Sequence, residues 1–130
     1  MPTFSCVSRA YLLDSGYLAA LTGKDDFGMQ FEHAVLRHIR SDIRNKPFFY
    51  KDTVECDFIV QNGRGVKAIQ VAFECRDPTT RQREIRGLIA ACRSFKLSKG
   101  WMVTFLDNSE TVIQDGITIN IVPFKEWIQI

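Results

Sequence analysis

The sequence lacks the groupings of residues from which zinc and nucleotide sites are usually built. Its four cysteines form no C-x-x-C pair, and its two histidines, His33 and His38, are five residues apart, where ligands on one helix face are commonly four apart. Gly16 and Gly23 are separated by six residues, whereas a phosphate loop needs four. We therefore expect neither a zinc site nor a nucleotide site.

Long hydrophobic runs are also missing. No charged start is followed by an extended apolar stretch, so neither a signal peptide nor a membrane span is expected. Unpaired cysteines are typical of buried free thiols in a protein of a reducing compartment. The sequence thus predicts a cytoplasmic protein with no membrane partner.

The 130 residues contain 45% hydrophobic residues, which is enough for one domain spanning 1–130 with a sizeable core. The net charge of +2 does not by itself imply nucleic-acid binding. Basic residues are concentrated in 76–99, and four of them are candidate nucleic-acid contacts: Arg81, Arg83, Arg86 and Arg93. The alternative is an ordinary solvated helix side.

The order of apolar patterns predicts an α/β protein. The patterns predict an N-terminal helical lead-in over 1–25, with a short helix at 8–21, and then a helix over 26–44 capped by Asp25 or Asp26. An extended segment from Pro47 and strands at 54–60 and 66–75 follow, and a basic helix over 79–99 is begun by Asp77-Pro78 and ended by Gly100. The last predicted elements are a strand at 101–106, a hairpin at 112–119 and a short helix at 123–127. A nearly continuous apolar strand after a crossover helix indicates parallel pairing. The expected architecture is a sandwich of helices around a mixed sheet.

Polar residues interrupt the apolar pattern at three places. Glu32 lies on the apolar stripe of Leu36, Ile39 and Ile43, and Asp57 enters a strand. On the next strand Gln70, Ala72 and Glu74 share one face, whereas Val71, Phe73 and Cys75 share the other, apolar face, which should point to the core.

Carboxylate and amide oxygens are the ligands that Mg²⁺ prefers, and magnesium-dependent phosphodiester cleavage commonly uses two carboxylates. Glu32, Asp57, Gln70 and Glu74 are therefore the candidate catalytic residues, with Asp57, Gln70 and Glu74 as candidate ligands of Mg²⁺ or Mn²⁺. Each acid also has a simpler explanation. Glu32 could pair with an arginine such as Arg86, Asp57 could bond nearby backbone amides, and Glu74 could be an exposed strand acid.

Three segments carry a resemblance to a known family: Phe31-Glu-His-Ala-Val35, Glu55-Cys-Asp-Phe-Ile59 and Ala68-Ile-Gln-Val71. In this order they resemble the PD-(D/E)XK nuclease-like domain, and more narrowly the C-terminal domain of archaeal and bacterial AAA-type ATPases. The segments Tyr11-Leu-Leu-Asp-Ser-Gly-Tyr-Leu18 and Asp77-Pro-Thr-Thr-Arg-Gln-Arg-Glu-Ile85 are similar to further parts of that domain. The resemblance covers residues 10 to 127 and implies a restriction-endonuclease-like sandwich in a prokaryotic protein.

By this resemblance, Glu32 matches the helix acid, Asp57 the principal metal-binding acid, Gln70 the second acid and Ala72 the nuclease lysine. The last two positions depart from the family pattern, because Gln70 brings no charge and Ala72 has no functional group. Loss of one charge-stabilising donor typically lowers a rate by about 10²–10³. The sequence therefore predicts a nuclease-like domain that associates with nucleic acid such as DNA and is catalytically impaired. The alternative is a non-enzymatic interaction or regulatory module that partners an ATPase.

Overall fold

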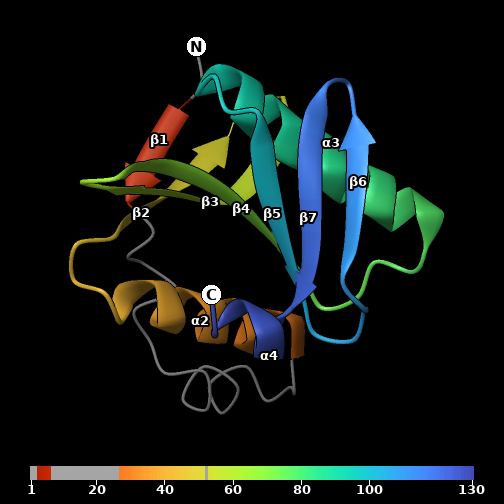
Figure 1. The fold of residues 1–130 in the computed structure, drawn as a ribbon, viewed down its shortest axis with the longest axis horizontal. Coiled ribbons are helices and arrows are strands. Elements are labelled where there is room, and N and C mark those ends of the chain that lie inside the picture. The colour runs from red at the N-terminus through yellow and green to blue at the C-terminus, as the bar shows by residue number, and fades with distance from the viewer. Residues whose placement is uncertain (1–2, 7–26, 52) are drawn as a thin grey trace.

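The computed structural model describes residues 3–6, 27–51 and 53–130. Seven strands form one sheet in the order β1-β2-β3-β4-β5-β7-β6 (Figure 1). The strands are β1 (Thr3–Cys6), β2 (Lys46–Lys51), β3 (Glu55–Asn62), β4 (Gly65–Ala72), β5 (Lys99–Thr104), β6 (Glu110–Gln114) and β7 (Ile117–Pro123).

The sheet is mixed. Strands β1 to β4 pair antiparallel, β4–β5 and β5–β7 pair parallel, and β6 pairs antiparallel with β7. Helix α3 (Pro78–Ser94) connects β4 to β5, because parallel neighbours need a crossover. The predicted parallel pairing of the apolar strand after this helix is confirmed.

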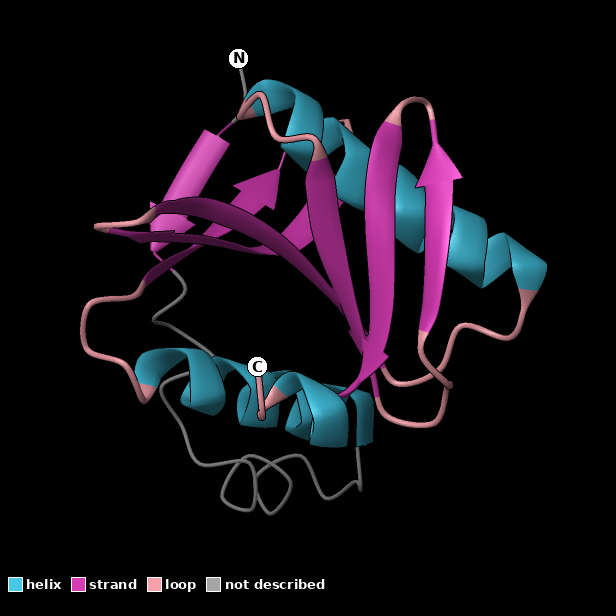
Figure 2. Ribbon diagram, viewed as in Figure 1, coloured by secondary structure: helices cyan, strands magenta, loops and turns pink. Residues whose placement is uncertain are grey.

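Helices cover both faces of the sheet (Figure 2). Helix α3 packs on one face, where Ile85, Leu88, Ile89 and Cys92 meet residues such as Ile59 and Met102. Helices α2 (Phe27–Arg40) and α4 (Phe124–Trp127) lie on the other face, over Phe58, Ile69, Val71 and Val103. The α/β architecture with a mixed sheet flanked by helices is as predicted.

One hairpin turn and one helix start are formed by the residues predicted to form them. The β6–β7 hairpin turns at Asp115 and Gly116, whose φ values of 52° and 77° suit the Asp-Gly sequence. Helix α3 begins as predicted, since the carboxylate of Asp77 accepts a hydrogen bond from the backbone N–H of Thr80 at 2.8 Å and Pro78 occupies the first turn.

Two predicted helix ends are wrong. Helix α3 ends at Ser94, where Lys96 takes a φ of 56° and the N–H of Leu97 reaches the carbonyl of Cys92 at 2.7 Å, so Gly100 lies inside β5 instead of ending the helix. Helix α2 ends at Arg40, which leaves Ile43 94% exposed outside its apolar stripe.

The N-terminal part of the prediction is tested only in β1. Residues 3–6 of the expected helical lead-in over 1–25 form a strand that pairs with β2. The helix expected at 8–21 and the caps Asp25 and Asp26 lie outside the described residues. Among those that are described, no helix has the length and apolar character needed to cross a membrane. Cys56, Cys75 and Cys92 are buried free thiols, as predicted.

Candidate functional site

The candidate site begins where the ladder between β3 and β4 ends. The last backbone pair towards this end is Phe58 with Ile69. Strand β3 carries one extra residue opposite β2. Phe48 pairs with Ile59 and Tyr50 with Cys56, so two steps along β2 correspond to three steps along β3. Such a bulge redirects side chains and is frequent next to functional sites. Beyond Phe58 and Ile69, the backbones of β3 and β4 are no longer paired at Asp57 and Gln70.

Side chains replace the missing backbone bonds at this end of the two strands. The side-chain oxygen of Gln70 accepts a hydrogen bond from the backbone N–H of Asp57, and the Asp57 carboxylate accepts one from the N–H of Val71, both at 2.8 Å. Each strand therefore satisfies a backbone donor of the other through a side chain. The bonding of Asp57 to a nearby amide, one of the simpler explanations for this residue, is present in the structure.

Gln70 also joins the sheet to α3. Its amide nitrogen donates to the carbonyl oxygens of Glu55 and Glu84, both at 3.1 Å, and the residue is only 2% exposed. The face of β4 that carries Gln70 and Ala72 lies under α3, so the expectation that only the Val71 face points to the core is wrong. Through its side-chain nitrogen and oxygen, Gln70 of β4 is thus hydrogen-bonded to backbone groups of β3 and α3.

Gly87 makes this close approach of α3 possible. A Cβ atom at this position would lie 2.0 Å from the carbonyl oxygen of Glu55 and 2.9 Å from the amide nitrogen of Gln70. Only glycine fits against a backbone oxygen at that distance. This residue was not singled out from the sequence, because a glycine inside a helical pattern gives no sign of what it faces.

Glu32 and Asp57 are brought together from α2 and β3. Burial raises the pKa of Asp57 well above its ordinary value, and the Glu32 carboxyl raises that pKa further by charge repulsion and a hydrogen bond. The surroundings of Asp57 therefore favour the neutral form of its carboxyl group.

Glu84, which was not among the predicted site residues, is the other acid that acts on Asp57. It lies half-buried on α3, and burial raises its pKa. Glu74, which was predicted to contribute, is exposed two residues beyond the end of β4. Of the four predicted residues, the structure thus places Glu32, Asp57 and Gln70 together.

A family model described as a domain of unknown function, DUF4143, matches residues 27–127. The chain belongs to the DUF4143 family. The match runs from the first residue of α2 to the last residue of α4 and so includes every residue of the site. Neither the curated proteins nor the solved structures contain a match to the chain. The description of the DUF4143 family assigns no activity.

In this DUF4143 domain, the predicted nucleic-acid contacts on α3 are largely ion-paired. Arg81 lies 2.6 Å from Glu110, Arg83 lies 3.4 Å from Glu84, and Arg93 lies 3.9 Å from Asp115. Arg86 is exposed. The pairs lower the positive potential that the sequence suggested for this helix.

The ligands gathered at the site do not suit a divalent cation. Magnesium prefers several charged or neutral oxygen ligands in octahedral geometry, whereas here burial favours the neutral form of Asp57 and the Gln70 amide is bonded to backbone groups. In the part of the chain that the structure describes, no group of three or more His, Cys, Asp or Glu side chains is placed to hold a metal ion. Ala72, at the position of the nuclease lysine in the resemblance, is buried under α3.

Proposed function

We propose that this DUF4143 domain is a nuclease-like domain that associates with nucleic acid but does not cleave it. The proposal includes a restriction-endonuclease-like sandwich as its fold. It is supported by the order of Glu32, Asp57 and Gln70 along α2, β3 and β4, which agrees with the resemblance to PD-(D/E)XK domains.

One observation carries the proposed lack of cleavage. The amide of Gln70 is 2% exposed and makes three hydrogen bonds to backbone groups of β3 and α3. A ligand or catalytic group has to reach substrate or metal, and this side chain is already used within the protein. Gln70 and Ala72 stand where the resemblance expects a second acid and a lysine, so neither position supplies the charge that phosphoryl chemistry uses.

The experiment compares the wild-type protein with Asp57→Asn on plasmid DNA and on single-stranded DNA, with Mg²⁺ or Mn²⁺. Asparagine keeps an oxygen that can accept from the Val71 N–H, so the fold is preserved while the acid is lost. We expect the same background for both proteins. Metal-dependent cleavage by the wild type that disappears in Asp57→Asn would contradict the proposal.

A second candidate is a protein-interaction module for an ATPase. DUF4143 domains are usually found with AAA ATPases, and three of the four predicted nucleic-acid contacts are occupied by Glu110, Glu84 and Asp115. Binding to a DNA duplex over a series of salt concentrations separates the two candidates, because affinity that depends on phosphate contacts falls steeply as salt rises. Absence of binding at low salt would favour the interaction module.

A further inference from the structure

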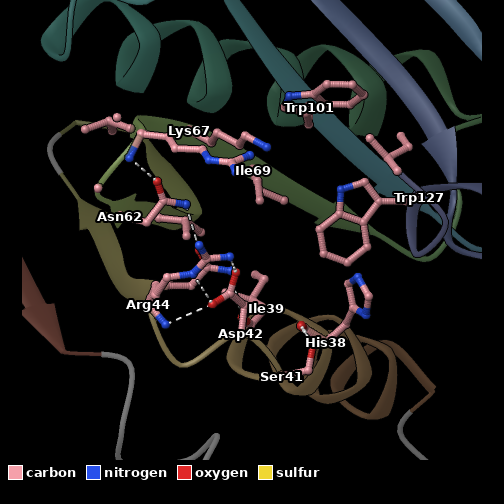
Figure 3. A pocket seen from close by; sticks show the side chains of 17 residues that line it. His38, Ile39, Ser41, Asp42, Arg44, Asn62, Lys67, Ile69, Trp101 and Trp127 are labelled. Carbon is pink, nitrogen blue, oxygen red and sulfur yellow. Dashed lines mark hydrogen bonds and ion pairs between the residues drawn. The ribbon is translucent and has the colours of Figure 1, made fainter.

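A second polar region lies at the other end of β3 and β4, where these strands form their turn. A pocket of about 420 Å³ opens there between the end of α2, the β3–β4 turn, β5 and α4 (Figure 3). This volume is within the range of ligand pockets, which is roughly 300–1,000 Å³. None of Glu32, Asp57, Gln70 or Glu84 lines it.

The pocket has an apolar, aromatic side. Val60 and Ile69 are buried on the sheet, and Trp101 and Trp127 are half-buried on β5 and α4. The ring of Trp127 lies 4.9 Å from the ring of His38 in an edge-on arrangement. In Figure 3 both tryptophans are on one side of the opening, and Asn62, Lys67 and Arg44 are on the other.

The opposite side carries more positive than negative charge. Arg44 lies 2.9 Å from Asp42, whose pKa its guanidinium lowers to about 2, so these two residues form an ion pair and cancel each other's charge. Arg64 and Lys67 also line the pocket, are exposed, and form no ion pair with the described residues. The pocket therefore has a net positive charge beside two indole rings.

Residues around the β3–β4 turn hold this arrangement in place. The side-chain oxygen of Asn62 accepts from the N–H of Arg64 at 2.7 Å, and its amide nitrogen donates to Asn45 at 2.8 Å. Asn45 in turn donates to the carbonyl of Ile39 at the end of α2, at 2.9 Å. These hydrogen bonds connect the β3–β4 turn, which carries Arg64, to the end of α2.

We propose that this pocket binds one nucleotide unit, with the base against Trp101 and Trp127 and the phosphate on Arg64 and Lys67. Aromatic rings bind bases by stacking, and Lys and Arg bind phosphate through charge and hydrogen bonds. The choice of ligand class rests on the proposed association with nucleic acid. The unit is either a free nucleotide or one residue of a single strand.

Intrinsic fluorescence tests the proposal directly, because the protein has only two tryptophans and both line the pocket. The ligands are thymidine monophosphate, inorganic phosphate and an oligothymidylate of eight residues. We expect saturable quenching by the nucleotide at roughly tenfold lower concentration than any change with phosphate, because stacking of the base adds to the binding of the phosphate. Tighter binding of the oligomer than of the monomer would identify a single strand as the source, and equal binding would identify the free nucleotide.

Charge variants locate the site. Lys67→Gln and Arg64→Gln each remove a charge-assisted contact, so we expect affinity to fall about tenfold or more. Lys67→Arg should keep the affinity within about threefold, since the charge is retained. Lys96→Gln removes an equal charge from an exposed residue two positions beyond the end of α3, on the other face of the sheet, and should leave binding unchanged.

Three results would overturn the proposal, and the first and the third leave the proposed function standing. Oligonucleotide binding that is unaffected by Lys67→Gln but weakened by Arg86→Gln would place nucleic acid on α3 and leave the association with nucleic acid intact. No binding of the nucleotide or the oligomer at low salt would reject the pocket proposal, and the duplex titration then decides separately whether the association with nucleic acid fails as well. Equal binding of phosphate and nucleotide would show an anion site without base recognition, which also contradicts the proposal.

Discussion

At the scale of single residues, Asp57 is an acid in surroundings that favour its neutral form. Its carboxyl receives one backbone hydrogen bond from Val71, which lowers its pKa, but burial and the neighbouring Glu32 outweigh that bond and raise the pKa well above the ordinary value. Between the unfolded and the folded pKa, the native state holds a proton that the unfolded chain has lost. The free energy of unfolding therefore falls as pH rises through this interval.

The variant Asp57→Asn removes this titration and keeps the hydrogen bond to Val71. We expect the variant to match the wild type near pH 4 and to be the more stable protein at pH 7 to 8, since one unit of pKa difference corresponds to about 1.4 kcal/mol. Denaturant unfolding at several pH values measures the difference. Parallel pH profiles of the two proteins would contradict a raised pKa of Asp57 in the folded state.

The same residues show what the sequence could and could not reveal. The alternation of polar and apolar residues was sufficient to single out Glu32, Asp57 and Gln70, and the structure places them together. The direction in which Gln70 points was not predictable, because both faces of β4 are covered by helices and alternation does not distinguish two buried faces. Glu84 belongs to a helix with exposed charges, and nothing in its spacing indicated that it would lie near Asp57.

At the scale of elements, the contact between α3 and β3 depends on the absence of one side chain. Gly87 faces the Glu55 carbonyl so closely that a methyl group would lie 2.0 Å from the oxygen. In an exposed helix, replacing glycine by alanine usually stabilises by about 1 kcal/mol. At position 87, an alanine would force α3 to move away from the sheet, and this movement would weaken the hydrogen bonds of Gln70.

We expect Gly87→Ala to destabilise the protein by about 2–4 kcal/mol, the range in which overpacking and lost buried hydrogen bonds combine. Gly63→Ala is the matched control, because no atom lies within 4 Å of the added carbon and its φ is not in the left-handed region. The control should differ from the wild type by less than about 0.5 kcal/mol. Thermal unfolding of both variants measures this. A Gly87→Ala protein as stable as Gly63→Ala would show that α3 does not depend on this contact.

Local signals also explain which elements were predictable. The Asp-Gly hairpin and the Asp-Pro start of α3 are encoded by adjacent residues, and both are confirmed. The end of α3 is set by Lys96 in a left-handed conformation, which lysine adopts only where the tertiary structure requires it, so the pattern pointed to Gly100 instead. Strand β1 pairs with β2, distant in the chain, and no feature of its four residues predicted that pairing.

At the scale of the whole molecule, opposite charges gather at opposite ends of β3 and β4. Glu32, Asp57 and Glu84 lie where the two strands separate, and Arg64 and Lys67 lie beside their turn.

The clustered acids raise the question of whether a divalent cation stabilises the fold. A ligand that binds only the native state raises stability by RT ln(1 + [L]/Kd), or about 2.7 kcal/mol at a concentration one hundred times Kd. Because burial favours the neutral form of Asp57 and Gln70 is bonded to backbone groups, we expect Mg²⁺ and Mn²⁺ to leave the melting temperature at pH 7 within about 1 °C of its value in chelator, where 1 kcal/mol would shift it by roughly 2–8 °C. The measurement is a thermal melt at constant ionic strength, with Asp57→Asn as the comparison. A rise that only the wild type shows would mean that a cation binds at Asp57 and would contradict our description of the site as one that does not suit a divalent cation.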